Sequence, residues 1–89
     1  MRNLLIENTF KRDMKRLQKR SWHLNDLYQY IKLLQNYKEL PLQARPHKLS
    51  GEYDGFWECQ IKNDWLLIYS FTQEILLLVR TGSHGDLFE

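Results

Sequence analysis

The sequence predicts a single α+β domain in which two helices cover one face of a mainly antiparallel sheet. Three observations lead to this fold class. The first half of the chain has two segments with helical periodicity, the second half has three strand-like segments joined by short turns, and 89 residues with 43% apolar positions allow one domain only, residues 1–89. The expected order is β-α-α-β-β-β, with the second face of the sheet partly open.

The first half of the chain begins with a predicted strand over residues 3–7. Thr9 is a candidate N-cap for the helix that follows, in which Phe10, Met14 and Leu17 recur at helical spacing. The remaining surface of this helix is cationic and carries Arg12, Lys15, Arg16, Lys19 and Arg20. The segment is therefore an amphipathic helix with a basic outer face.

A second helix is expected from Asn25 or Asp26 to about Tyr37, because apolar residues again recur at helical spacing. Its apolar stripe consists of Leu27, Tyr30, Ile31 and Leu34. Pro41 and Pro46 then predict an extended loop that reaches Gly51.

The second half of the chain contains three predicted strands, over residues 56–61, 65–71 and 74–81. The connections at residues 62–64 and 72–73 are short, so the strands should form an antiparallel meander. Alternation places Glu58 and Gln60 on one face of the first of these strands, and Arg80 projects together with Leu76 and Leu78 from the last. We expect Glu58, Gln60 and Arg80 to share the open face, with Arg80 in a cleft or paired with Glu58.

Charge is distributed unevenly along the chain. Residues 1–48 hold 11 Lys or Arg and 4 Asp or Glu, whereas residues 49–89 hold 2 and 7. Clustered cations attract phosphate or carboxylate groups, so the first half should meet a polyanionic or acidic partner. Charge alone does not choose between RNA, DNA and an acidic protein.

The location of the protein is suggested by its cysteine content and its apolar runs. A single cysteine, Cys59, can form no internal disulfide, and three scattered histidines do not form a structural zinc motif. No apolar run exceeds five residues, so we expect neither a signal peptide nor a membrane span. A cytoplasmic location follows as an expectation.

Several polar residues are candidates for a reaction site. His47, Glu58, Asp64, Arg80 and His84 form a set suited to metal-independent RNA cleavage without a cofactor. One group must take the ribose 2′-hydroxyl proton, another must protonate the departing 5′ oxygen, and a cation must neutralise the phosphorane. Imidazole titrates near neutral pH and guanidinium matches phosphate, so both groups suit these roles.

Two segments carry a resemblance to a known family. The segment H-K-L-x-G-E-Y-x-G-F-W-E-C-Q-I-K-N-D-W-L-L-I-Y begins at His47, and L-L-L-V-R-T-G-S-H-G-D-L-F begins at Leu76. Together they resemble the YafQ branch of the RelE/ParE toxin superfamily. The resemblance implies a RelE-like fold and a toxin of a type II toxin–antitoxin pair, an endoribonuclease that cuts mRNA on the ribosome and has a cognate antitoxin as its partner.

The same resemblance implies roles for individual residues. His47, Asp64 and His84 match the family's catalytic positions, and Glu58 and Arg80 line the same site. Gln60, Phe88 and Lys48 are assigned to substrate binding. The basic residues Arg12, Lys15, Arg16, Lys19 and Arg20 are assigned to contacts with ribosomal RNA or the antitoxin.

One position departs from the family pattern. Gln60 stands where YafQ-like toxins commonly have a histidine, and its amide forms hydrogen bonds but cannot carry a proton near neutral pH. This departure leaves open a non-catalytic ribosome-binding or RNA-binding module with a weakened site.

A second alternative uses the same scaffold: a ParE-like protein that poisons DNA gyrase, which would not need the two histidines. Simpler interpretations also stay open for His84 as a solvated turn residue, Asp64 as a turn cap and Arg80 as part of a structural ion pair.

Overall fold

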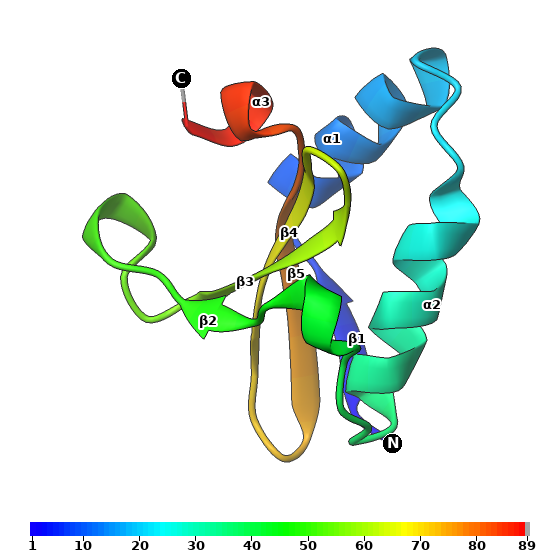
Figure 1. The fold of residues 1–89 in the computed structure, drawn as a ribbon. Helices are drawn as coiled ribbons and strands as arrows, with labels where there is room; N and C mark the ends of the chain where they lie inside the picture. Colours follow the sequence, from blue (N-terminus) through cyan, green and yellow to red (C-terminus); the bar gives the residue numbers. More distant parts are fainter. Residues whose placement is uncertain (89) are drawn as a thin grey trace.

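The computed structural model describes residues 1–88, which form one five-stranded sheet and its helices (Figure 1). The strand order is β1-β5-β4-β3-β2, with β1 parallel to β5 and the other neighbours antiparallel. The elements are β1 (Asn3–Ile6), α1 (Asn8–Lys19), α2 (Leu24–Gln35), η1 (Leu42–Ala44), β2 (His47–Lys48), η2 (Gly51–Tyr53), β3 (Trp57–Lys62), β4 (Trp65–Phe71), β5 (Ile75–Gly82) and α3 (His84–Phe88).

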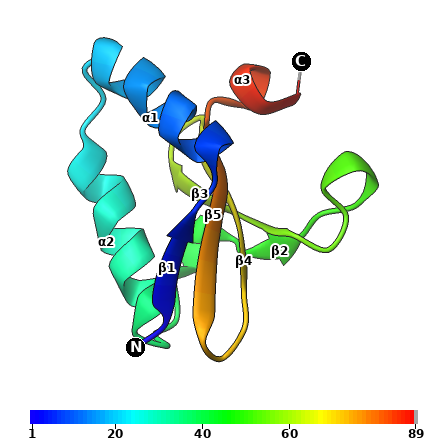
Figure 2. The ribbon, with the colours of Figure 1, turned by 180° about the vertical axis from the view of Figure 1, so that it is seen from behind.

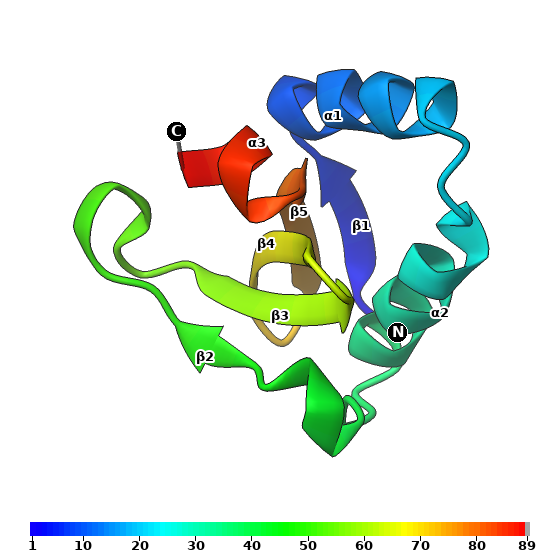
Figure 3. The same ribbon diagram turned by 45° about the horizontal axis from the view of Figure 1, so that its top comes forward.

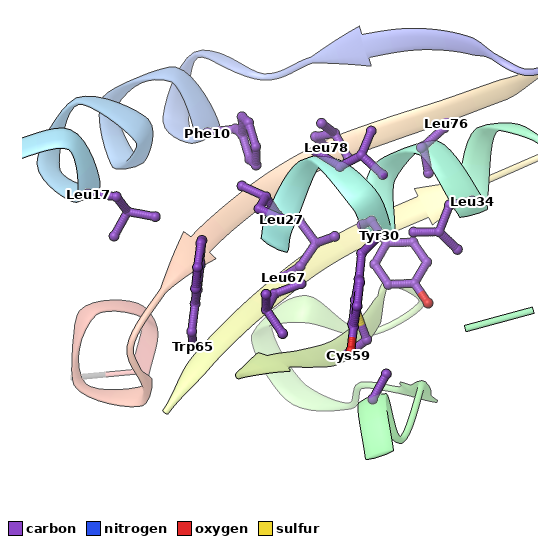
Figure 4. Packing of buried hydrophobic residues seen from close by; sticks show 14 residues of the cluster. Phe10, Leu17, Leu27, Tyr30, Leu34, Cys59, Trp65, Leu67, Leu76 and Leu78 are labelled. Carbon is purple, nitrogen blue, oxygen red and sulfur yellow. The ribbon is translucent and has the colours of Figure 1, made fainter. Parts of the chain in front are cut away.

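The main core lies between the two long helices and one face of the sheet. Leu17 from α1 and Leu27 from α2 are fully buried against Leu67 of β4 and Leu78 of β5 (Figure 4). Burial of each such side chain contributes about 1.5–3 kcal/mol, so this layer provides much of the stability of a small domain. The α+β class and the helix-covered face are confirmed. No helix within residues 1–88 has the length and apolar character to cross a membrane.

Four predicted boundaries and one predicted cap in the first half of the chain need correction. The first strand ends at Ile6, and α1 begins at Asn8 rather than after Thr9. The Thr9 hydroxyl does not cap the helix but donates to the Val79 carbonyl, 2.7 Å away, and so joins α1 to β5. The second helix begins at Leu24 and ends at Gln35, earlier at both ends than predicted.

Four elements, the 3₁₀ helices η1 and η2, the strand β2 and the helix α3, were not predicted because each is too short to show periodicity. His47 and Lys48 form a two-residue strand, β2, that pairs with β3, where an extended loop was expected. Residues 84–88 form a short terminal helix, α3, where only a turn was expected. The chain order is therefore β-α-α-β-β-β-β-α rather than the predicted β-α-α-β-β-β, and Figure 2 shows β1 at one edge beside β5.

A β-bulge in β5 changes the predicted faces of that strand. Ile68 pairs with Arg80 while Tyr69 pairs with Leu78, so Val79 is an extra residue in the ladder. Leu78 therefore faces the helices, whereas Arg80 faces the opposite side with Ile68. The prediction that Arg80 lies on the open face is confirmed, but its grouping with Leu76 and Leu78 was wrong, because simple alternation fails across a bulge.

The second face of the sheet carries a smaller core. Ile68 and Val79 are buried there under Leu87 of α3, and Tyr53 of η2 packs against the same cluster. Figure 3 shows α3 and the segment around η2 on the side of the sheet away from α2. These two short elements lie on the otherwise open face and flank the polar residues described next.

Candidate active site

Strand register aligns three of the predicted site residues in one row across the sheet. His47 on β2 is opposite Glu58 on β3, Glu58 is opposite Ile68 on β4, and Ile68 is opposite Arg80 on β5. Residues directly opposite each other point to the same face. Three strand spacings separate the ends of this row, about 14 Å between the backbones of His47 and Arg80. We call these four residues the site row.

His47 is oriented by contacts at both ring nitrogens. Its Nδ1 lies 2.8 Å from the Arg45 carbonyl oxygen, and its Nε2 lies 3.4 Å from Oε1 of Glu58. A carbonyl oxygen only accepts hydrogen bonds, so Nδ1 carries the proton in the neutral ring and Nε2 is free to accept one. The half-exposed His47 side chain thus presents a basic nitrogen beside a carboxylate.

Glu58 is the buried carboxylate of the site row. The residue is only 9% exposed, and among the described residues no hydrogen-bond partner reaches its Oε2 atom. A buried polar atom without a partner is rare and is often retained for function. Oε2 is itself covered, so it is an unsatisfied buried acceptor, and Oε1 is the oxygen that faces His47.

Arg80 is held by a residue of α1 and not by Glu58. Its Nε donates to Oδ2 of Asp13 at 2.7 Å and its Nη2 to Oδ1 at 3.1 Å, a two-point contact. The hydrogen bond with Asp13 raises the pKa of Arg80 further above its ordinary value, so the guanidinium stays charged. Ile68 stands between Glu58 and Arg80 in the site row, which explains why the expected pair of Glu58 with Arg80 does not form.

The terminal helix adds two more predicted residues beside Arg80. The His84 ring lies 5.0 Å from the Phe88 ring, and Phe88 packs edge-on against Tyr53, with ring centroids 6.0 Å apart. The Tyr53 hydroxyl accepts a hydrogen bond from Nη1 of Arg80 at 3.3 Å. These contacts place His84 and Phe88 on the same side of the sheet as Arg80, joined through Tyr53.

Two carboxylates support the start of α3. Asp64, in the turn between β3 and β4, accepts the His84 backbone N–H at 3.1 Å. Asp86 accepts the Ser83 backbone N–H at 2.9 Å, while the Ser83 hydroxyl accepts that of Asp86 at 3.1 Å, a capping box. Asp64 was expected to cap its own turn, but its recorded hydrogen bond is with a backbone N–H twenty residues further along the chain, at the start of α3.

An ion pair joins α3 to α1. Arg20 donates to both carboxylate oxygens of Asp86, at 2.7 and 2.9 Å. The hydrogen bond from Arg20 lowers the pKa of Asp86 well below its ordinary value. Gly82 makes this geometry possible, because a Cβ at that position would lie 2.8 Å from the Asp86 carboxylate.

The two other predicted substrate residues lie apart from the site row. Gln60 lies two residues beyond Glu58 on β3, opposite Leu66, and its amide donates to the Asn63 carbonyl in the following turn. Lys48 points to the opposite face from His47, because consecutive strand residues alternate, and its ammonium lies 5.9 Å from the Trp57 ring. In residues 1–88, no group of three or more His, Cys, Asp and Glu side chains could hold a metal ion.

Comparison with known proteins tests the resemblance found in the sequence. Residues 2–89 match the family model described as the bacterial toxin of the type II toxin–antitoxin system, YafQ. The chain belongs to the YafQ family of bacterial toxins. This membership confirms the resemblance carried by the two segments of the second half of the chain.

The similarity extends over the whole length. The mRNA interferase toxin YafQ of Escherichia coli K12 is 34% identical over 88 residues, 98% of this chain and 96% of that protein. The crystal structure of YafQ from E. coli BL21(DE3) is similar with a TM-score of 0.93 and 32% identity, covering 100% of both chains. The E. coli DinJ–YafQ toxin–antitoxin complex contains a chain with a TM-score of 0.89 and 34% identity, covering 99% and 98%.

The residues that hold this YafQ-family site together were not predicted from the sequence. Asp13, Asp86, Tyr53 and the Arg45 carbonyl all contact predicted site residues. One signal was present for Asp13: it is the only acidic residue of α1 and lies on the apolar stripe, three residues after Phe10. The basic residues predicted for α1 fall into two groups. Arg16 and Arg20 form ion pairs, whereas Arg12, Lys15 and Lys19 are exposed.

Proposed function

We propose that this YafQ-family toxin is an mRNA interferase, an endoribonuclease that inhibits translation by cutting mRNA. The similar E. coli proteins are named mRNA interferase toxins. The observation that carries the proposal is the site row, which sets the basic nitrogen of His47 and the guanidinium of Arg80 on one face of one rigid sheet. A proton acceptor and a phosphate-binding cation are the groups that RNA cleavage requires.

In the proposed reaction, Nε2 of His47 takes the proton of a ribose 2′-hydroxyl, and the 2′ oxygen attacks the adjacent phosphorus. Glu58, 3.4 Å from Nε2, stabilises the imidazolium that forms. Arg80 neutralises the phosphorane, and His84 protonates the 5′ oxygen as the P–O bond breaks. The products are a cyclic phosphate end and a free 5′-hydroxyl, and protein side chains supply every proton transfer.

The roles of the remaining residues follow from their positions. Phe88 is 40% exposed and packs against His84 with the two rings tilted, so its ring is available to a base of the mRNA. Asp64 acts by fixing the backbone of His84 rather than by direct proton transfer. Gln60 stabilises the turn that carries Asp64.

The basic side of α1 supports action on the ribosome. Arg12, Lys15 and Lys19 are exposed, and clustered cations bind phosphate in a salt-dependent manner. We assign these residues to ribosomal RNA, which would orient the mRNA over the site row. Such a substrate places the protein in the cytoplasm, where translation occurs.

The proposed partner is an antitoxin protein, since the E. coli YafQ structures include complexes with DinJ. A groove of about 690 Å³ lies between β1, α1 and α2 and has Leu4, Ile6 and Tyr28 among its apolar lining. Lys11, Lys15 and Lys32 line the same groove. Apolar lining with a cationic rim fits an amphipathic acidic segment, and this is the segment we assign to the antitoxin.

Cleavage in a purified translation system tests the proposed function. Wild type and His84→Ala are added to translating ribosomes, and primer extension maps the ends of the mRNA. We expect cuts with wild type and a loss of about a hundredfold in rate with His84→Ala. His23→Ala, at an exposed histidine between the helices, is the matched control and should cleave normally.

The alternative classes predict different outcomes in the same experiment. A gyrase poison would arrest growth and inhibit DNA supercoiling without cutting mRNA. A non-catalytic module would bind ribosomes and leave transcripts intact. Either result with folded wild-type protein would overturn the proposed function.

A further inference from the structure

Asp13 is a buried carboxylate that contacts the site without facing it. It lies in the middle of α1 and is 1% exposed. Its Oδ2 atom accepts from Nε of Arg80 at 2.7 Å and from the backbone N–H of Thr81 at 3.0 Å, and its Oδ1 atom accepts from Nη2 of Arg80 at 3.1 Å. The carboxylate therefore bonds two consecutive residues of β5, Arg80 through both oxygens and Thr81 through Oδ2.

These contacts immobilise the Arg80 side chain. A guanidinium group has five N–H donors in one plane, and two of them are bonded to the same carboxylate. Nη2 also donates to the Asp86 carbonyl at 3.4 Å, and Nη1 donates to Tyr53 at 3.3 Å. Counting the described residues only, one Nη1 proton remains for a substrate oxygen.

Two further arginines lie close to Asp13 and Asp86, so the cluster of charges around Arg80 stays positive overall. Arg16 lies 3.4 Å from Asp13 and 3.8 Å from Asp86, and Arg20 lies 2.7 Å from Asp86. With Arg80, the cluster contains three guanidinium groups and two carboxylates, a net charge of +1. Asp13 therefore orients Arg80 without making the site electrically neutral.

A contribution to stability does not by itself explain why a carboxylate occupies position 13. Replacing a buried ion pair by apolar residues of similar size is often neutral or stabilising, so such pairs are weak contributors to stability. The apolar stripe of α1 already contains Phe10 and Leu17 on either side of Asp13. An acidic residue there has the specific consequence of fixing where the Arg80 guanidinium points.

We propose that Asp13 is a positioning residue, which aims the Arg80 guanidinium at the scissile phosphate through its two-point contact. This inference rests on the proposed function, because it assumes that Arg80 binds the phosphorane. Asp13 itself touches no substrate. Its removal should therefore slow the chemical step and leave mRNA binding largely intact.

The test compares Asp13→Asn with wild type in the ribosome cleavage assay, with kcat and KM measured separately. We expect kcat to fall about a hundredfold, as for a misplaced catalytic group, and KM to change less than about threefold. Asp26→Asn is the matched control, since Asp26 forms an exposed ion pair with Lys62 at 3.9 Å on another helix. Circular dichroism and urea unfolding establish that each variant is folded.

A double-mutant cycle separates positioning from a general loss of structure. In an Arg80→Lys background the two-point contact is already lost, so Asp13→Asn should cost little further rate. In a His47→Gln background, Asp13→Asn should still lower kcat by about the same factor as in the wild type. Equal losses in both backgrounds, or an unchanged kcat in folded Asp13→Asn, would overturn the proposal.

If Asp13→Asn does not fold, a second variant, Asp13→Glu, tests the proposal. Asp13→Glu keeps the charge and moves the carboxylate by one methylene, so a positioning role predicts a reduced kcat in folded protein and a structural charge role predicts none. Failure of the proposed function is distinguishable, because wild type would then cleave no RNA at all. A wild type that cleaves beside an equally active Asp13→Glu would contradict the positioning role only.

Discussion

The Nε2 atom of His47 lies 3.4 Å from Oε1 of Glu58, on two strands that pair directly opposite each other. The Arg45 carbonyl fixes the proton of the neutral ring on Nδ1, so the nitrogen facing Glu58 is the one that can accept a proton. Backbone register and one carbonyl oxygen together set the protonation geometry of the proposed base. This arrangement has consequences for both activity and stability.

Replacing Glu58 by glutamine should lower activity and raise stability. The charge that stabilises the His47 imidazolium is lost, so kcat should fall about tenfold or more. The buried Oε2 atom, which has no partner among the described residues, becomes part of a neutral amide that costs less to bury, and the free energy of unfolding should rise by about 1 kcal/mol. Cleavage kinetics and urea unfolding measure the two effects.

Glu52→Gln is the control for this change, because Glu52 is exposed in η2. It should alter neither quantity. A Glu58→Gln protein that is less stable than wild type would show that Glu58 serves the fold.

Replacing Gln60 by histidine should raise the cleavage rate. Position 60 is on the same face of β3 as Glu58, and histidine carries a proton near neutral pH where an amide does not. We expect an increase of about tenfold, measured on the ribosome between pH 6 and pH 8. A rate equal to that of wild type would contradict this prediction and show that a histidine at position 60 adds nothing to the proton transfers assigned to His47 and His84.

Asp86→Asn should destabilise the protein more at neutral pH than in acid. The contact with Arg20 lowers the pKa of Asp86 in the folded state, so this carboxylate stabilises the fold above its unfolded pKa of about 3.9. That contribution is lost as the pH falls from there toward the lower folded pKa. Unfolding by urea at pH 7 and pH 3 should therefore show a difference between wild type and variant that shrinks in acid.

Asp54→Asn, at an exposed position, provides the comparison for nonspecific charge effects. It should shift neither curve. A difference between Asp86→Asn and wild type that persists unchanged at pH 3 would show that the capping box, not the ion pair, is what the variant disrupts.

Cys59 should be inert toward thiol reagents in the folded protein. Burial raises the pKa of this thiol to about 12, and its side chain is fully buried in the main core. Labelling by a disulfide reagent at pH 8 should be at least about a thousandfold slower than in urea, because both thiolate formation and access require opening of the core. Since Cys59 is the only cysteine, absorbance of the released thiol gives the rate directly, and fast labelling in buffer would contradict the packing in Figure 4.

The strands and the two long helices were predictable because their patterns are local. Phe10 and Leu17 mark the buried stripe of α1. Alternation along β3 places the side chains of Glu58 and Cys59 on opposite faces of the sheet. Short elements carry too few residues for such a pattern, which is why the two-residue β2 and the five-residue α3 were not foreseen. Of the predicted site residues, the structure brings His47, Glu58 and Arg80 into one row of the sheet and places Lys48 on the opposite face, and their roles in cleavage stay predictions.

The sequence alone determined the α+β class, the family resemblance and the polar residues worth testing, because spacing and residue type are properties of the chain itself. Only the tertiary structure decided which of them meet. The bulge at Val79 turns Arg80 onto the face of Glu58, and Asp13 reaches Arg80 across 67 positions of the chain. Register shifts and buried ion pairs depend on how distant segments pack, and no local periodicity records that packing.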